Sequence, residues 1–210
     1  MASPRPLQHQ PPLEASVDEG RRELAAPGVT VGACAVTAQI VIAGDIAAAA
    51  AALGAILGQV PPVQPNHIAG KDPCLLWLAP DKRLLVSQSA GRFDLAQRLA
   101  SALAGRFAAV SDVTDGLAVI DILGPGARNL LAMGCALDLD GDVFTPAMSA
   151  RTLLANQPVL LYPLASPDVK HEPGMPRMPQ PPNRGYRLHV DRALLHYLWK
   201  WLAQSATALH

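Results

Sequence analysis

The chain has 210 residues, half of them hydrophobic, and its 17 basic side chains balance 17 acidic ones. This length and apolar content predict one large or two small globular domains and exclude a chain that is disordered throughout. Without a surplus of basic residues, nucleic acid is not an expected partner. No apolar run is long enough to predict a membrane-spanning helix.

The first 27 residues predict an N-terminal arm, because prolines alternate there with Gln, Glu and Arg and leave little apolar surface to bury. The arm is either a disordered tail or a segment that lies on a partner. We expect residues 28–210 to form a single domain. The arm contains no recognisable targeting signal, which predicts a cytoplasmic protein.

Branched residues and helix caps predict the first elements of the domain. Residues 29–42 are rich in Val, Ile and Thr and predict one or two strands. Asp45 and Gly58 are suited to cap the two ends of an alanine-rich helix. Residues 74–79 and 83–87 predict a hairpin, and an amphipathic helix follows it. The expected inner face of that helix comprises Phe93, Leu95, Ala96, Leu99, Ala100 and Leu103.

Residues 110–139, VSDVTDGLAVIDILGPGARNLLAMGCALDL, contain the sharpest succession of local signals. The run from Leu117 to Leu123 predicts a buried strand, and Gly124-Pro125-Gly126 predicts a tight turn into a short helix that ends at Gly134 with a left-handed cap. This turn is similar to a nucleotide-binding turn, but Asn129 stands where that fingerprint needs its third glycine. We therefore interpret the turn as a tight connection between strand and helix.

The next segment predicts turns and strands. The spacing of Asp138, Asp140 and Asp142 does not fit a calcium loop and predicts a solvated turn. Residues 151–155 and 159–162 predict two strands, and residues 163–185 predict a long proline-rich loop.

The C-terminal segment predicts one strand and one helix. Apolar side chains at 186, 188 and 190 alternate with Arg187, His189 and Asp191, which predicts a half-buried strand. Asp191 is suited to cap the last helix. The expected core face of that helix comprises Leu194, Leu195, Leu198, Trp199 and Leu202.

The order of these elements repeats. It is β-α-β-β-α and then β-α-β-β-β-α, which predicts an α+β fold of two related halves, at about residues 28–108 and 109–210. Helices against antiparallel strands in both halves give the domain a pseudo-twofold character.

The residue types do not form a catalytic, cofactor-binding or metal-binding constellation. The six histidines lack ligand spacing, and we expect each of them to be solvated. Cys34, Cys74 and Cys135 are too widely spaced for a zinc site and predict reduced thiols. Asp121, in the central strand, is expected to face a partner or to pair with a cation.

The stretch 110–139 resembles the central block of the gamma subunit of heterotetrameric sarcosine oxidase. The segments MSARTLLANQPVLLYPL and GYRLHVDRALLHYLWKWLAQSA extend the resemblance, which covers roughly residues 29–206. That family is distantly similar to the folate-binding domain of the glycine-cleavage aminomethyltransferase. The resemblance implies a duplicated, ferredoxin-related α+β fold of that kind. At the place where the aminomethyltransferase has a carboxylate that meets folate, this chain has Asn156, Gln157 and Pro158.

The resemblance also implies a role for the chain. It would be a structural, cofactor-free subunit of a complex that oxidatively demethylates sarcosine to glycine, with formaldehyde or methylene-tetrahydrofolate and hydrogen peroxide as products. Alpha, beta and delta subunits would be its partners and would hold FAD, FMN, NAD, tetrahydrofolate and zinc. Two alternatives remain open. One is a free-standing folate-binding or aminomethyltransferase-like protein, and the other is a scaffold subunit of another amine dehydrogenase.

Six residues are the expected contacts with partner subunits. Tyr197 and Trp201 lie four residues apart beside the core face of the last helix, and such aromatic residues dominate interface hot spots. The proline-rich loop adds adaptable apolar side chains and cations, namely Met175, Met178, Arg177 and Arg184.

Overall fold

Two antiparallel sheets make up the centre of the computed structural model, which describes residues 23–165 and 183–209. Sheet A has six strands in the order β1 (Glu23–Ala26), β2 (Val29–Ala33), β8 (Leu117–Leu123), β11 (Asn183–Asp191), β10 (Gln157–Ala165) and β9 (Ala150–Leu154). Sheet B has five strands in the order β4 (Ile68–Ala69), β5 (Cys74–Ala79), β6 (Lys82–Ser87), β3 (Ala38–Gly44) and β7 (Ala108–Asp112).

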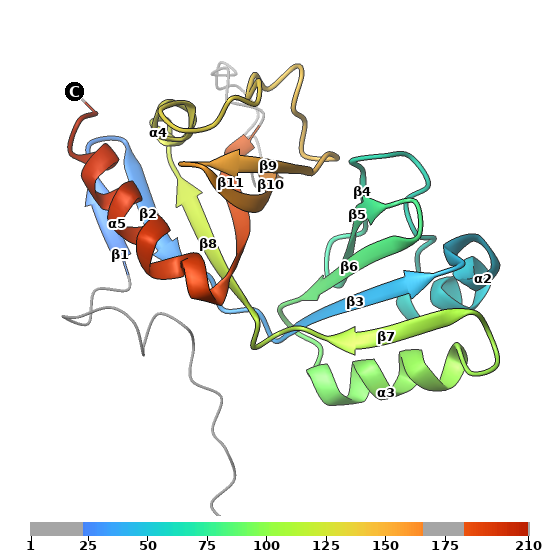
Figure 1. The fold of residues 1–210 in the computed structure, drawn as a ribbon. Helices are drawn as coiled ribbons and strands as arrows, with labels where there is room; N and C mark the ends of the chain where they lie inside the picture. Colours follow the sequence, from blue (N-terminus) through green and yellow to red (C-terminus); the bar gives the residue numbers. More distant parts are fainter. Residues whose placement is uncertain (1–22, 166–182, 210) are drawn as a thin grey trace, which may run out of the picture.

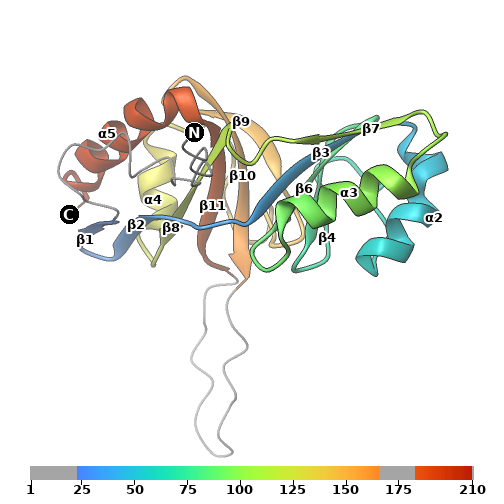
Figure 2. The same ribbon diagram turned by 90° about the horizontal axis from the view of Figure 1, so that it is seen from below.

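The helices lie on the outer faces of the two sheets (Figures 1 and 2). On sheet A they are α4 (Ala127–Ala132) and α5 (Leu195–Ala206), and α5 is preceded by a 3-10 turn, Arg192–Leu194. On sheet B they are α2 (Ile46–Leu57) and α3 (Arg92–Ala102). The order of layers is therefore helices, sheet A, sheet B, helices, as expected for an α+β fold.

Apart from β1, which has no counterpart in sheet B, the two sheets have the same strand order when β3 is matched with β8. A helix follows each of these strands, and a second helix follows β6 in one sheet and β11 in the other. The expected division near residue 108 does not separate the sheets. β2 precedes β3 in the chain but lies in sheet A, and β7, which begins at residue 108, lies in sheet B.

The helix ends show which local signals acted as expected. The Asp45 carboxylate accepts a hydrogen bond from the Ala48 N–H, and Gly58 ends α2 in the left-handed conformation, so both predicted caps are confirmed. The predicted left-handed cap at Gly134 is wrong, because its φ is not positive. Gly134 has another constraint: a Cβ there would lie 2.5 Å from Trp201 Cζ2.

Three other expectations need correction. The last residues of the expected arm, Glu23–Ala26, pair with β2. The ends of the expected proline-rich loop, residues 163–165 and 183–185, extend β10 and β11. Phe93 is 74% exposed, not part of the inner face of α3, and Arg92 lies over its ring instead.

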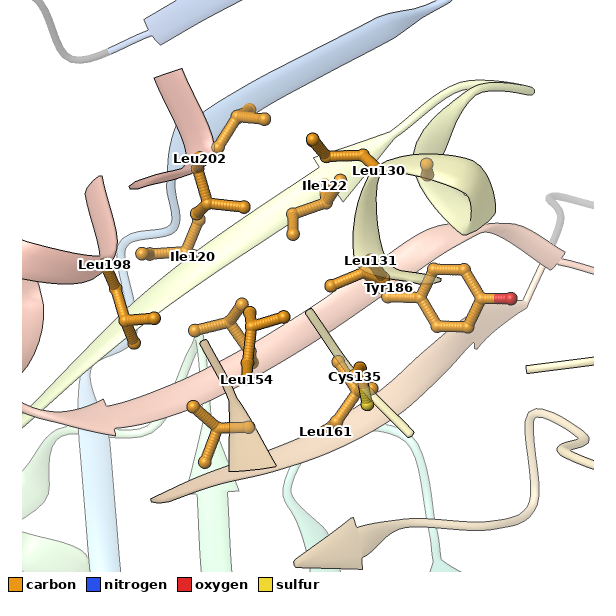
Figure 3. Packing of buried hydrophobic residues seen from close by; sticks show 14 of the residues in the cluster. Ile120, Ile122, Leu130, Leu131, Cys135, Leu154, Leu161, Tyr186, Leu198 and Leu202 are labelled. Atoms are coloured by element: carbon orange, nitrogen blue, oxygen red, sulfur yellow. The ribbon is translucent and has the colours of Figure 1, made fainter. Parts of the chain in front are cut away.

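One large core lies between sheet A and its helices (Figure 3). Leu198 and Leu202 of α5 and Leu130 and Leu131 of α4 pack there on Ile120 and Ile122 of β8 and on strands β10 and β11. This confirms most of the predicted core face of the last helix, although Leu194 is only partly buried. A second core lies between sheet B and its helices and includes Ile40, Leu53, Leu85 and Leu99.

A third core joins the two sheets to each other. It contains Cys74, Leu76, Leu84 and Val86 from sheet B and Leu160, Tyr162 and Leu164 from sheet A. Both faces of the central strands are consequently buried. The polar face of β11, predicted to be solvated, lies against sheet B: Arg187 is 7% exposed and His189 is 2% exposed.

Candidate functional site

A buried polar cluster lies between the two sheets. At one end of it, Arg187 of β11 donates two hydrogen bonds to Asp121 of the adjacent β8, from Nε to Oδ1 at 2.6 Å and from Nη2 to Oδ2 at 2.8 Å. These two residues are directly opposite each other in the ladder. The expectation that Asp121 pairs with a cation is therefore confirmed, and the cation comes from this chain.

At the other end, His189 links the two sheets. Its Nδ1 lies 2.6 Å from Gln39 Oε1 of β3, and its Nε2 lies 3.3 Å from the Tyr162 hydroxyl of β10. The Gln39 amide nitrogen donates to the Leu117 carbonyl, so the amide oxygen faces the imidazole. Nδ1 therefore carries the proton, and Nε2 accepts from Tyr162. The prediction of a solvated histidine at 189 is wrong, because the second sheet covers this face of β11.

Burial and charge fix the protonation of these groups. Burial, followed by the positive charge of Arg187, lowers the pKa of His189 to about 3, so the imidazole is neutral near pH 7. Burial also raises the pKa of Tyr162 above its usual range, which keeps the hydroxyl protonated. Burial alone would lower the pKa of Arg187, but the hydrogen bonds and charge of Asp121 outweigh it and raise that pKa.

The cluster is closed. In the described part of the chain, the only buried side-chain nitrogen or oxygen without a hydrogen-bond partner is Ser149 Oγ, which is not one of its atoms. A satisfied network of this kind specifies how the two sheets pack. Each buried side-chain nitrogen and oxygen of the cluster has a hydrogen-bond partner within the chain, which supports a structural role for the cluster.

The cysteines nearby are poor nucleophiles. Burial, and then the charge of Asp121, raises the pKa of Cys34 to about 11. Burial raises the pKa of Cys74 to about 11 as well. Both thiols therefore stay protonated near pH 7, where a reactive cysteine would need to be a thiolate. These two and Cys135 are free thiols, in agreement with the sequence.

The neutral state of His189 predicts a pH-dependent stability. Unfolding restores its pKa to about 6.5, so the unfolded chain binds more protons between pH 6.5 and about 3. The free energy of unfolding should fall as the pH falls through this window, by about 1 kcal/mol between pH 6 and pH 5. Denaturant titrations at both pH values measure this change. His189→Asn should remove most of it, and His196→Asn, at an exposed position on α5, should not. If the free energy of unfolding of His189→Asn fell as much between pH 6 and pH 5 as that of the wild type, His189 would not be the group responsible.

The glycine turn at residues 124–126 packs on the turn between β1 and β2. The Gly126 N–H donates to the Gly28 carbonyl at 2.8 Å, and a Cβ on Gly124 would lie 2.5 Å from the same oxygen. These glycines allow two backbones to approach closely. The N–H that would face a phosphate in a nucleotide-binding turn is occupied within the chain, which favours the interpretation as a tight connection.

The three aspartates after α4 stabilise their own turn. Asp138 accepts from the Asp140 N–H, and Asp140 accepts from the Asp142 N–H and forms an ion pair with Arg128 at 3.0 Å. Within the described ranges, no group of three or more His, Cys, Asp and Glu side chains is arranged to hold a metal ion. In the same ranges, no helix combines the length and apolar character that crossing a membrane requires.

The expected interface residues fall in different settings. Tyr197 on α5 is 49% exposed, and its hydroxyl donates to the Ala155 carbonyl. Trp201 is half-buried over Gly134 and packs against the core of sheet A. Arg184 lies in β11 near the start of the strand. Met175, Arg177 and Met178 lie outside the described residues.

A groove of about 600 Å³ opens between the sheets beside the polar cluster. His189 forms part of its lining, and Lys82, Arg151 and Asp191 lie at its exposed rim. The rest of the lining is mainly aliphatic and includes Val41, Leu78, Leu84, Leu117, Leu153 and Leu160. The sequence did not predict this groove, since its walls come from strands far apart in the chain.

Comparison with known proteins gives the family. The model of the sarcosine oxidase, gamma subunit family matches residues 42–162, which is more than half of the chain and includes strands of both sheets. The chain belongs to this family. The resemblance noted in the sequence is thereby confirmed.

Individual members of the sarcosine oxidase gamma subunit family support this assignment. The gamma subunit of an Arthrobacter species is 34% identical over 159 residues, 71% of this chain and 77% of that relative. The gamma subunit of Corynebacterium sp. strain P-1 is 34% identical over 119 residues, 57% of each chain.

Solved structures support the fold. The chain is similar to one in heterotetrameric sarcosine oxidase from Corynebacterium sp. U-96, with a TM-score of 0.75, 23% identity and coverage of 95% of both chains. It is also similar to the glycine cleavage system aminomethyltransferase T from Bartonella henselae, with a TM-score of 0.52, 14% identity, and coverage of 79% of this chain and 42% of that one. The predicted α+β fold related to the aminomethyltransferase is therefore confirmed.

Proposed function

We propose that this chain is the structural, cofactor-free gamma subunit of a heterotetrameric sarcosine oxidase. Alpha, beta and delta subunits would be its partners and would carry FAD, FMN, NAD, tetrahydrofolate and zinc. The complex would convert sarcosine to glycine, with formaldehyde or methylene-tetrahydrofolate and hydrogen peroxide as the other products. The observation that carries the proposal is membership of the gamma subunit family, whose model matches residues 42–162, a range that includes strands of both sheets. The free thiols support a cytoplasmic location.

The polar cluster supports a structural role. His189 joins the two sheets through Gln39 of β3, and the ion pair of Arg187 and Asp121 links β11 to β8 within sheet A. Near pH 7 the His189 imidazole is neutral and the Tyr162 hydroxyl is protonated. The position where the aminomethyltransferase was expected to have its carboxylate is a tight turn here. Ala155 and Asn156 have positive φ, and Gln157 begins β10. A folate-directed carboxylate is not present at this turn.

Co-expression tests the proposal. The tagged chain, produced with candidate alpha, beta and delta subunits, should elute with them as one complex with sarcosine-dependent peroxide production. The isolated chain should bind neither flavin nor tetrahydrofolate, as measured by absorption spectroscopy and calorimetry. Failure to co-elute with the three subunits would contradict the proposal. Stoichiometric binding of tetrahydrofolate by the isolated chain would favour the alternative of a free-standing folate-binding protein.

The surface of α5 gives a second prediction within this proposal. Tyr197→Ala should weaken assembly while changing the free energy of unfolding by less than about 1 kcal/mol, since the ring is half exposed. Trp201→Ala should weaken assembly and also destabilise the chain by about 2 kcal/mol, because the indole covers Gly134. Gel filtration of the co-expressed complex and denaturant titration of the chain separate the two effects. Undiminished assembly of both variants would exclude α5 from the interface.

A further inference from the structure

The groove between the sheets has one closed end. The Ile68 N–H donates to the Ala147 carbonyl, and the Ser149 N–H donates to the Asn66 carbonyl, so the segment just before β9 is tied to β4 of sheet B. Beyond this tie, sheet A forms one wall of the groove, with residues 151–153 of β9 at its edge, and β3, β5 and β6 of sheet B form the other. β9 is the last strand of sheet A, so its outer edge is unpaired along this wall.

The backbone of β9 directs hydrogen-bonding groups toward that edge. Leu154 pairs with Gln157 across a two-residue turn with positive φ at Ala155 and Asn156. The two residues of such a closing pair form two backbone N–H···O=C hydrogen bonds with each other. The next pair, Leu153 and Pro158, is a non-hydrogen-bonded pair of the ladder. The N–H and C=O groups of Leu153 and Arg151 therefore point away from β10. Apart from the charge of Arg151, this short edge lacks the Lys, Pro and bulges that often prevent strand addition.

The rim of the groove is positively charged. Lys82 of β6 and Arg151 of β9 are exposed on opposite walls, and neither has an ion-pair partner among the described residues. Asp191 also lies at the rim, where its carboxylate accepts the Ala193 N–H and caps the 3-10 turn, so the formal net charge of these three rim side chains is +1. His189 adds no charge, because it is neutral. Two cations on facing walls match carboxylates spaced along an extended chain better than a single small anion.

The segments of this chain outside the described residues do not fit that charge pattern. Residues 1–22 contain three arginines and three acidic residues, and residues 166–182 contain Lys170, Arg177, Asp168 and Glu172, so both are neutral overall. Residues 166–182 also join β10 to β11 at the end of that hairpin away from the groove. The occupant that fits is a segment of another subunit.

We propose that the groove binds an extended, acidic segment of a partner subunit, which adds as a strand to the edge of β9. Backbone hydrogen bonds to Leu153 and Arg151 would hold it, its apolar side chains would pack on Leu78 and Leu160, and its carboxylates would face Lys82 and Arg151. This is strand addition, a common mode of peptide recognition. The exposed side chain of Leu153, 54% accessible, would be covered in the complex. The inference rests on the proposed function, since it needs partner subunits.

Charge reversal tests the electrostatic part. In the co-expressed complex, Lys82→Glu combined with Arg151→Glu should weaken assembly at least about tenfold. The matched control, Lys71→Glu combined with Arg98→Glu, changes the same charges at exposed positions outside the groove and should assemble like the wild type. Melting temperatures of the isolated variants show that both are folded. Equal assembly of the groove variant and the control would overturn the proposal.

Leu153 tests the strand addition itself. Leu153→Pro removes an N–H that does not face β10, so the chain should fold but fail to assemble. Leu153→Ala keeps the N–H and should retain most of the assembly. A photoreactive amino acid at Leu78 should cross-link, in the wild-type complex, to a partner peptide containing Asp or Glu. Assembly of Leu153→Pro at the wild-type level, or a cross-link only to a basic peptide, would overturn the inference alone. Lack of assembly by the wild type would overturn the proposed function as well.

Discussion

Asp121→Ala should lower the free energy of unfolding by about 3 kcal/mol, because it leaves the Arg187 guanidinium buried without its carboxylate. The side chains of Arg187 and Asp121 are 9% and 17% exposed, so water cannot replace the lost partner effectively. Two hydrogen bonds are lost with the charge, and the Tyr162 hydroxyl remains beside an uncompensated cation. Denaturant titration at pH 7 measures the change.

Two controls separate the ion pair from general effects of the substitution. Asp94→Ala removes the carboxylate of an exposed ion pair with Arg98 and should cost less than about 0.5 kcal/mol. Replacing both buried partners, as Asp121→Leu with Arg187→Met, should be much less harmful than Asp121→Ala, since no unpaired charge remains. A cost for Asp121→Ala as small as that for Asp94→Ala would show that the buried pair is dispensable.

Gly124→Ala should destabilise the chain by about 3 kcal/mol or more. Gly124 has φ of 102°, which alanine rarely adopts, and its Cβ would lie 2.5 Å from the Gly28 carbonyl oxygen. The backbone would have to shift where the β1–β2 turn packs on the start of α4. The hydrogen bond from Gly126 to Gly28 would be strained by the same shift.

Gly58→Ala is the matched control for Gly124→Ala. Gly58 also has positive φ, 69°, but a Cβ there would meet nothing within 4 Å. Only the left-handed conformation is penalised, and the cost should be about 1 kcal/mol. The difference between the two variants isolates the close approach of the backbones. Equal costs would show that contact with Gly28 does not constrain the turn.

Local signals in the sequence predicted local structure well. The Asp45 and Gly58 caps, the hairpin of β5 and β6, and the core face of α5 depend on neighbouring residues and were confirmed. The predicted left-handed cap at Gly134 was wrong, because this position needs glycine for the close approach of Trp201, which is distant in the sequence. The prediction that Phe93 belongs to the inner face of α3 was wrong, because helical spacing alone does not show where the edge of a buried face lies.

The candidate site was harder to predict, for a physical reason. Alternation along β11 correctly assigned its apolar face but gave no sign that a second sheet covers the polar face. Arg187 and His189 are tolerated there because Asp121, Gln39 and Tyr162 satisfy them, and these partners lie on three other strands. The sequence indicated only that Asp121 would meet a cation. The groove needs both sheets in place and has no local signature.

The path of the chain through the two sheets has a consequence for the order of folding. Sheet B is formed by the continuous segment from β3 to β7, whereas sheet A needs β2 from before that segment and β8 from after it. During synthesis, sheet B with α2 and α3 can therefore fold before β8, the pairing partner of β2, has been synthesised. The hairpin of β1 and β2 presents an unpaired edge until β8 leaves the ribosome. The slow step should be the late closure of sheet A, whose long-range pairing carries the larger loop-closure entropy.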